Sequence, residues 1–256
     1  MTRRVNVRLA PWVYTAVLLL FWESVVRVLS IPVFFLPPPS IIAEAFIDFW
    51  GPIYRNSLFT LSTTMIGFGM AVGFGVLLGL AVGWSRSIYA GLYPLMIGFN
   101  AIPKVAVVPI LVLWFGIGFV PAVLTAFLIS FFPIVVNVAT GLATIEPELE
   151  DVLKGLGASK LDIMRKVGIP RTLPYFFGSL KVAITLAFVG SVISESIASN
   201  NGIGNLMLQA QAQFKVPLIF AGLVALAIEG IVMYWVMALL ENNLTRWAQR
   251  SGFAQT

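Results

Sequence analysis

The side chains that could do chemistry in this chain are few, because the sequence contains no cysteine and no histidine. Disulfides, cysteine-based zinc sites and histidine acid–base chemistry are therefore excluded. Serine–lysine chemistry remains, but no such pair stands out at helical spacing. The chain also has no Gly-x4-Gly-Lys-Ser/Thr run to cradle a phosphate. We therefore expect no catalytic residue, no metal site and no cofactor bound by this chain.

Among the charged residues within long apolar runs, three are candidates for a functional role: Lys104, Glu195 and Glu229. A charge at membrane depth is costly, so such a residue is a functional candidate by default. One hypothesis makes these residues the ion or proton sites of an ion-coupled secondary transporter. Such carriers commonly contain an internal repeat, and we find none in this sequence. The ion-coupled transporter is kept as the alternative function.

The run from 88 to 116 is interrupted by Pro103 and Pro109, and Asn100 and Lys104 stand beside the first break. Polar groups and irregular backbone at membrane depth are tolerated only against protein or a water-filled cavity. We predict that this region lines a translocation path, although Lys104 could equally extend its amine to a membrane interface. The residues predicted to line the path are Asn100, Pro103, Lys104, Asn137, Ser191 and Glu195.

The composition indicates the kind of structure that holds these residues in place. Of the 256 residues, 59% are apolar and only 11% are charged, whereas a soluble domain has about 25% charged residues. The sequence predicts an all-α polytopic membrane protein with one domain over 1–256. Three prolines at 37–39 end the first apolar run, and an interfacial helix is expected at 41–50, capped by Ser40. The six predicted spans are 11–30, 57–83, 88–116, 119–145, 172–198 and 217–240.

The distribution of basic residues predicts the orientation of these spans. Six spans place both termini on one side of the membrane. Eleven of the 16 Lys and Arg residues fall on that side, and only Arg55 and Lys215 fall on the other. Because cytoplasmic loops carry the excess of Lys and Arg, both termini and the loop at 146–171 are expected to be cytoplasmic. The net charge of +5 is too dispersed to suggest nucleic acid as a partner.

The second span contains small residues at every fourth position, at 67, 71, 75, 79 and 83, with Gly69 and Gly73 forming a parallel row. Small residues at this spacing let two helix backbones approach closely. We interpret the pattern as ordinary packing between membrane helices, because it is too common to indicate a particular function.

The longest strongly charged stretch runs from Pro147 to Pro170, between two apolar runs. Pro147 suits a first helical position, and the acidic residues after it suit a helix N-terminus. Glycines at 155 and 157 are expected to end this helix. Ser159 and Asp162 have the spacing of a capping box for a second helix, which Gly168 and Pro170 would end. Two short helices with a mixed apolar and charged surface suit docking into a groove of a soluble partner.

The pattern Asp151-x5-Gly157-x9-Val167-x-Ile169-Pro170 resembles the "EAA" coupling motif of permease subunits of bacterial ABC importers. This chain has Asp151-Val152-Leu153 where the family pattern opens with Glu-Ala-Ala. The resemblance extends to LPPPS at 36–40, to the run at 102–118 and to Gly-Ile-Gly at 202–204, which are similar to the nitrate, sulfonate and taurine branch.

This resemblance implies a bacterial inner-membrane importer in which two permease copies, as a homodimer, enclose the path. Two separate ATP-binding subunits would carry ATP and Mg²⁺ and receive the coupling loops. A periplasmic or lipid-anchored binding protein would deliver a small organic solute or anion, such as a sulfonate, nitrate or a heterocyclic vitamin precursor. The residues implied in coupling are Asp151, Leu156, Gly157, Ala158, Ser159, Leu161, Asp162 and Pro170.

Overall fold

The computed structural model describes residues 9–143 and 146–245, and the secondary structure within these ranges is helical. Arg3, Arg4, Arg8, Arg246 and Arg250, which contribute to the predicted orientation, lie outside the described residues. The elements in chain order are α1 (Ala10–Val28), α2 (Pro39–Asp48), α3 (Trp50–Gly83), α4 (Arg86–Ala101), η1 (Lys104–Val107), α5 (Val108–Phe115), α6 (Phe119–Ala143), α7 (Pro147–Gly155), α8 (Lys160–Ile163), η2 (Met164–Gly168), α9 (Ile169–Ala198), α10 (Ile203–Ala212) and α11 (Val216–Leu244).

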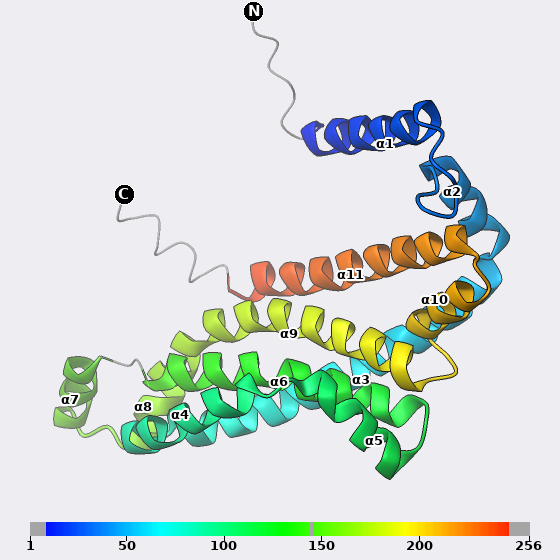
Figure 1. The fold of residues 1–256 in the computed structure, drawn as a ribbon. Helices are drawn as coiled ribbons and strands as arrows, with labels where there is room; N and C mark the ends of the chain where they lie inside the picture. The colour runs from blue at the N-terminus through cyan, green and yellow to red at the C-terminus, as the bar shows by residue number, and fades with distance from the viewer. Residues whose placement is uncertain (1–8, 144–145, 246–256) are drawn as a thin grey trace, which may run out of the picture.

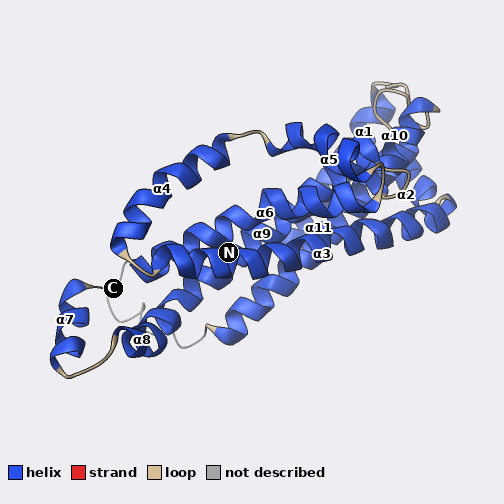
Figure 2. Ribbon diagram, turned by 90° about the horizontal axis from the view of Figure 1, so that it is seen from below, coloured by secondary structure: helices blue, strands red, loops and turns tan. Residues whose placement is uncertain are grey.

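Five helical stretches are long and apolar enough to cross a membrane, namely α1, α3, α6, α8 through α9, and α11. The third predicted span, 88–116, is present as two helical pieces, 87–101 and 104–115, bent by 72° at the break beside Pro103. The prediction of an all-helical polytopic membrane protein is thus confirmed. Figures 1 and 2 show α3, α6, α9 and α11 running side by side, with α7 and α8 at one end and α10 at the other. We call these ends the α7 end and the α10 end.

The centre of the bundle is formed by α3, α6 and α9, which make the most extensive contacts with one another. Of the two small-residue rows on α3, the row that begins at Gly67 faces α6. A methyl group on Gly67 would lie 2.6 Å from Cβ of Ala126, whereas one on Gly69 would meet no atom within 4 Å. The backbones of α3 and α6 therefore approach closely along the row that begins at Gly67, and α6 leaves the row at Gly69 uncovered.

The first two helices lie at the edge of the bundle, where α1 contacts mainly α2. Glu23 and Arg27, four residues apart on α1, form an ion pair in which Arg27 Nε donates to Glu23 Oε1 over 2.6 Å. The expectation that Ser40 caps α2 is wrong, because the N-cap position is Pro38. Ser40 instead donates its N–H and hydroxyl to the Glu23 carboxylate, at 3.0 and 2.8 Å. Glu23 therefore joins the end of α1 to the start of α2.

Candidate functional site

The charged segment begins as the predicted helix α7. Pro147 occupies the first turn, Glu148 and Glu150 lie in that turn, and Lys154 lies in the last. This distribution complements the helix dipole at both ends. Gly157 has a φ of +84°, a conformation that glycine adopts without steric cost. The chain therefore turns sharply after α7, as the glycines predicted.

The start of α8 is also as predicted. The Asp162 N–H donates to Ser159 Oγ, and the Ser159 N–H donates to Asp162 Oδ2, both over 3.2 Å. These reciprocal bonds form a capping box. They satisfy two backbone donors that a helix start would otherwise leave without partners.

The expectation that Gly168 and Pro170 end the second helix is wrong. The chain passes from α8 through the π-helical turn η2 into α9, and Pro170 occupies the first turn of α9. Proline is tolerated there because the N–H it lacks needs no partner within the helix. The segment 160–168 is therefore a helical extension of the fifth span. A push on α8 would pass directly into that span.

The surface of this segment contains two hollows. One, of about 370 Å³, is bordered by four of the residues implied in coupling, Leu156, Gly157, Ala158 and Asp162. Leu156, directly after α7, is 79% exposed, and Val152 of α7 is 61% exposed. Uncovered apolar side chains beside charged ones are typical of a protein–protein contact surface.

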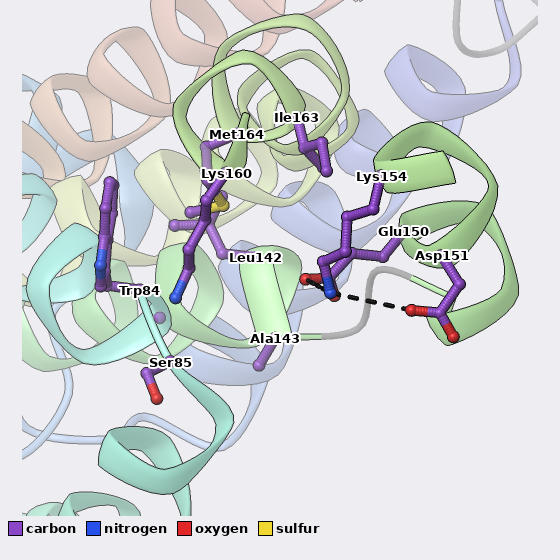
Figure 3. A pocket seen from close by; sticks show the side chains of 11 residues that line it. Trp84, Ser85, Leu142, Ala143, Glu150, Asp151, Lys154, Lys160, Ile163 and Met164 are labelled. Carbon is purple, nitrogen blue, oxygen red and sulfur yellow. Dashed lines mark ion pairs between the residues drawn. The ribbon is translucent and has the colours of Figure 1, made fainter. Parts of the chain in front are cut away.

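The second hollow, of about 350 Å³, separates α7 from the turn between α3 and α4, and Figure 3 shows its lining. Lys154 Nζ lies 2.9 Å from Glu150 Oε1 and 3.7 Å from Asp151 Oδ1. The hydrogen bond that Lys154 donates to Glu150 raises the pKa of Lys154 above its ordinary value. On the opposite wall, Lys160 Nζ lies 5.3 Å from the ring centre of Trp84. This cation–π contact links the coupling segment to the end of α3.

The structure brings together most of the residues implied in coupling. Ser159 and Asp162 form the cap, Leu161 is 45% exposed, and Asp151 borders the second hollow. Pro170 is separate from them, within α9. Sequence reasoning missed Trp84, because its neighbour in the fold, Lys160, is far away in the chain. It also missed Arg171, whose Nη2 donates to Glu146 Oε1 over 2.8 Å, across the base of the segment.

The predicted path residues fall into separate places. Asn100 and Lys104 border one hollow of about 450 Å³ at the bent span. Lys104 Nζ donates to the backbone oxygen and to Oδ1 of Asn100, at 2.8 and 2.7 Å. Pro103 is exposed between them, at the break itself. Both polar side chains are therefore held at the break.

The other predicted path residues lie elsewhere. Asn137 is half-buried on α6 and donates to the backbone oxygen of Pro133 over 2.8 Å. Ser191 and Glu195 are fully buried between α9, α3 and α10. The third intramembrane charge, Glu229, is buried on α11. Within the described residues, no group of three or more acidic side chains is arranged to hold a metal ion.

The structure is that of a polytopic helical membrane protein with a charged helical segment, α7 and α8, at one end of the bundle. The model of the family "binding-protein-dependent transport system inner membrane component" matches residues 71–246. The chain belongs to this family, and it is an ABC importer permease. The resemblance read from the coupling motif is thereby confirmed.

Curated relatives align over most of the chain. The formylaminopyrimidine transport permease of Halalkalibacterium halodurans is 32% identical, over 94% of this chain and 97% of its own length. The riboflavin transport system permease of Chloroflexus aurantiacus is 36% identical, over 90% and 87%. The taurine transport system permease of Escherichia coli is 27% identical, over 91% and 87%. These proteins are similar in length to this chain but differ in the solute they are named for.

The fold is similar to that of a solved transporter. A chain of the MetNI methionine ABC transporter, in an inward-facing form, superimposes with a TM-score of 0.66 at 18% identity. The match covers 97% of that chain but 77% of this one. Part of this chain therefore lies outside the shared fold.

Proposed function

We propose that this chain works as a homodimer in a bacterial inner membrane, with two ATP-binding subunits at the α7 end and a solute-binding protein at the α10 end. The observation that carries the proposal is the exposed apolar surface formed by Val152 of α7 and Leu156 just after it, beside charged groups at the α7 end. A water-exposed leucine beside a hollow is suited to a groove on a soluble partner. ATP and Mg²⁺ would be bound by that partner, and this chain would do no chemistry.

The helical continuity of α8, η2 and α9 supports a route for coupling. A displacement of α8 would be transmitted along one rigid element into the centre of the bundle, since α9 packs on α3 and α6. Closure of an ATPase dimer would therefore move the fifth span. This is the physical reason for placing the coupling segment between spans four and five.

The experiment is copurification of the ATPase subunit with the tagged chain from membranes of the native host. Leu156→Glu should reduce the recovered ATPase by about tenfold or more, because a charge in a docked apolar contact is costly. Leu208→Glu is the matched control, since Leu208 is 46% exposed at the opposite end. Wild-type recovery from Leu156→Glu would show that this surface does not dock the ATPase.

The same preparation separates the ABC importer from the alternative function. Transport that needs an ion gradient and ignores ATP, by a chain with which no ATPase copurifies, would favour the ion-coupled transporter.

Gly157→Glu and Ala158→Glu extend the docking test to the turn after α7, where both residues border the hollow beside Leu156. Both should also lose the ATPase while the chain stays in the membrane.

We further propose a small organic anion or a flat heterocycle as the solute. The hollow at Lys104 is bordered by the rings of Phe74, Phe99, Phe131 and Phe132. Aromatic faces suit planar or apolar groups, and the ammonium of Lys104 suits an anion. The relatives named for taurine, riboflavin and formylaminopyrimidine support this class. Uptake of these three compounds by the complete importer is the first measurement to make.

A further inference from the structure

The carboxylate of Glu195 is fully buried, yet it accepts hydrogen bonds from three different helices. Thr60 Oγ1 of α3 donates to Oε2 over 2.9 Å. On the same helix, Thr63 Oγ1 lies 3.4 Å from Oε1. Ser191 of α9 donates to Oε1 over 3.2 Å, and the backbone N–H of Gly204 in α10 donates to Oε2 over 3.2 Å. One side chain therefore ties α3, α9 and the start of α10 together.

The turn that leads into α10 is fitted around this carboxylate. Gly202 has a φ of +98°, and a methyl group there would lie 2.2 Å from Cδ of Glu195. The Gly202 N–H donates to Asn56 Oδ1 over 2.8 Å, and the Ile203 N–H donates to Thr60 Oγ1 over 3.0 Å. These N–H groups stand at a helix start, where they have no partner within the helix. Side chains of α3 and α9 supply those partners.

Solvent reaches none of the Glu195 side chain, so it does not touch a solute in this conformation. An anion at a helix N-terminus is favoured by the helix dipole, and an acceptor without donors at this depth would be costly. The geometry thus serves to hold α10 in place. Ile203 and Ala210, on the inner face of α10, are 0% and 2% exposed.

We propose that Glu195 is a positioning residue for transport, which clamps α10 onto α3 so that the hairpin of α9 and α10 moves with α3 as one unit. The statement about transport rests on the proposed function, because it concerns the outer end of a permease during the ATP cycle. The clamp itself rests only on the contacts of Glu195.

The test uses the absence of native cysteine in this chain. Ala210→Cys places a thiol under α10, and Ala212→Cys places one on its exposed side. In whole cells, a membrane-impermeant maleimide should label position 212 readily and position 210 slowly. Adding Glu195→Ala should raise labelling at 210 about tenfold or more, because the docked state loses its acceptor. Labelling at 212 should not change.

Glu195→Gln is the conservative variant that separates the hydrogen bonds of Glu195 from its charge, because glutamine has nearly the same shape. Its amide oxygen can accept from Gly204 N–H, and its amide N–H groups can donate to the hydroxyl oxygens of Thr63 and Ser191. Slow labelling at 210 should therefore return. Equal, slow labelling in the wild type and in Glu195→Ala would overturn the clamp.

A second variant covers the outcome in which Glu195→Ala fails to accumulate. Thr60→Val removes one hydroxyl without changing side-chain volume, and with it both the bond to Glu195 and the bond from Ile203. Labelling at 210 should rise about threefold to tenfold. Thr125→Val is the matched control, since Thr125 is also fully buried and its hydroxyl donates to a carbonyl of its own helix. Equal labelling of the two valine variants would overturn the proposal.

The part of the proposal that concerns transport is tested on the complete complex. If the hairpin moves with α3 as one unit, labelling at 210 should stay slow after the complex is trapped with ATP and vanadate. Faster labelling in the trapped wild-type complex would show that α10 separates during the cycle and would overturn this part. Failure to recover any ATPase subunit would count against the proposed function, whereas the labelling in whole cells would still decide the clamp.

Discussion

Lys181 of α9 and Glu241 of α11 form an ion pair, with Nζ 2.5 Å from Oε2, which joins α9 to the last turn of α11. Their side chains are 25% and 18% exposed, so water screens the pair only in part. The sequence places Lys181 within a span but does not reveal its partner, which lies 60 residues further along the chain. The pair explains how a lysine is accommodated in the fifth span.

Removing one member of this pair should cost more than removing both. Lys181→Met leaves the Glu241 carboxylate without its cation, and we expect a loss of ~1.5–3 kcal/mol in stability. The double variant Lys181→Met, Glu241→Gln should lie closer to the wild type, because no charge is left uncompensated. Thermal unfolding of the purified chain in detergent gives the double-mutant cycle. Strictly additive effects would show that the two residues are not coupled.

The two small-residue rows on α3 should respond differently to the same substitution. Gly67→Ala inserts a methyl group against Ala126 and should destabilise the fold by ~1–3 kcal/mol. Gly69→Ala meets no neighbour, so it should be neutral or stabilising by up to ~1 kcal/mol in the isolated chain. The unfolding temperatures of the two variants make the comparison. Equal losses would contradict the packing of α3 on α6.

The capping box at Ser159 should set the local stability of α8. Ser159→Ala removes the acceptor for the Asp162 N–H, at a cost of ~1 kcal/mol. Ser159→Thr keeps the hydroxyl acceptor and should retain most of the protection. Hydrogen exchange over residues 160–163 is the measurement. Unchanged exchange in Ser159→Ala would show that packing of the extension on the bundle, rather than the cap, holds this turn.

The α7 helix should be insensitive to pH near neutrality. Bonding to Glu150 raises the Lys154 pKa in the folded protein, so the pair's contribution is complete below the ordinary lysine value of 10.5. It is lost only as the pH rises through the raised value. Hydrogen exchange of α7, corrected for intrinsic rates, should therefore be constant from about pH 6 to about pH 9. A loss of protection near neutral pH would point to another titrating group.

Lys104 should matter for transport through its charge. In the complete importer, Lys104→Ala should lower uptake of an anionic solute by about tenfold, the effect of losing one charge-assisted bond. Lys104→Arg keeps the charge and should retain more uptake. The kinetics are measured in cells with equal amounts of complex. Unchanged kinetics in Lys104→Ala would support the reading in which this side chain only reaches the membrane interface.

Much of the architecture could be predicted because each span is encoded locally. An apolar run of suitable length, with charges at its ends, specifies a membrane helix whatever the rest of the chain does. The same holds for the α7 segment, where Pro147, Gly157, Ser159 and Asp162 act on backbone groups within three or four residues. The end of the second helix was mispredicted, because Gly168 and Pro170 can either stop a helix or continue it through a π turn.

The sequence by itself determined the class of protein, the spans, their predicted orientation and the capped coupling segment, because these depend on composition and short-range spacing. Only the tertiary structure decided which charges are paired and which row of glycines is covered. It also separated the predicted path residues, placing Lys104 beside an aromatic hollow and Glu195 inside a clamp. Such assignments depend on which helices become neighbours, and contacts between residues far apart in the chain leave no local signal in one sequence.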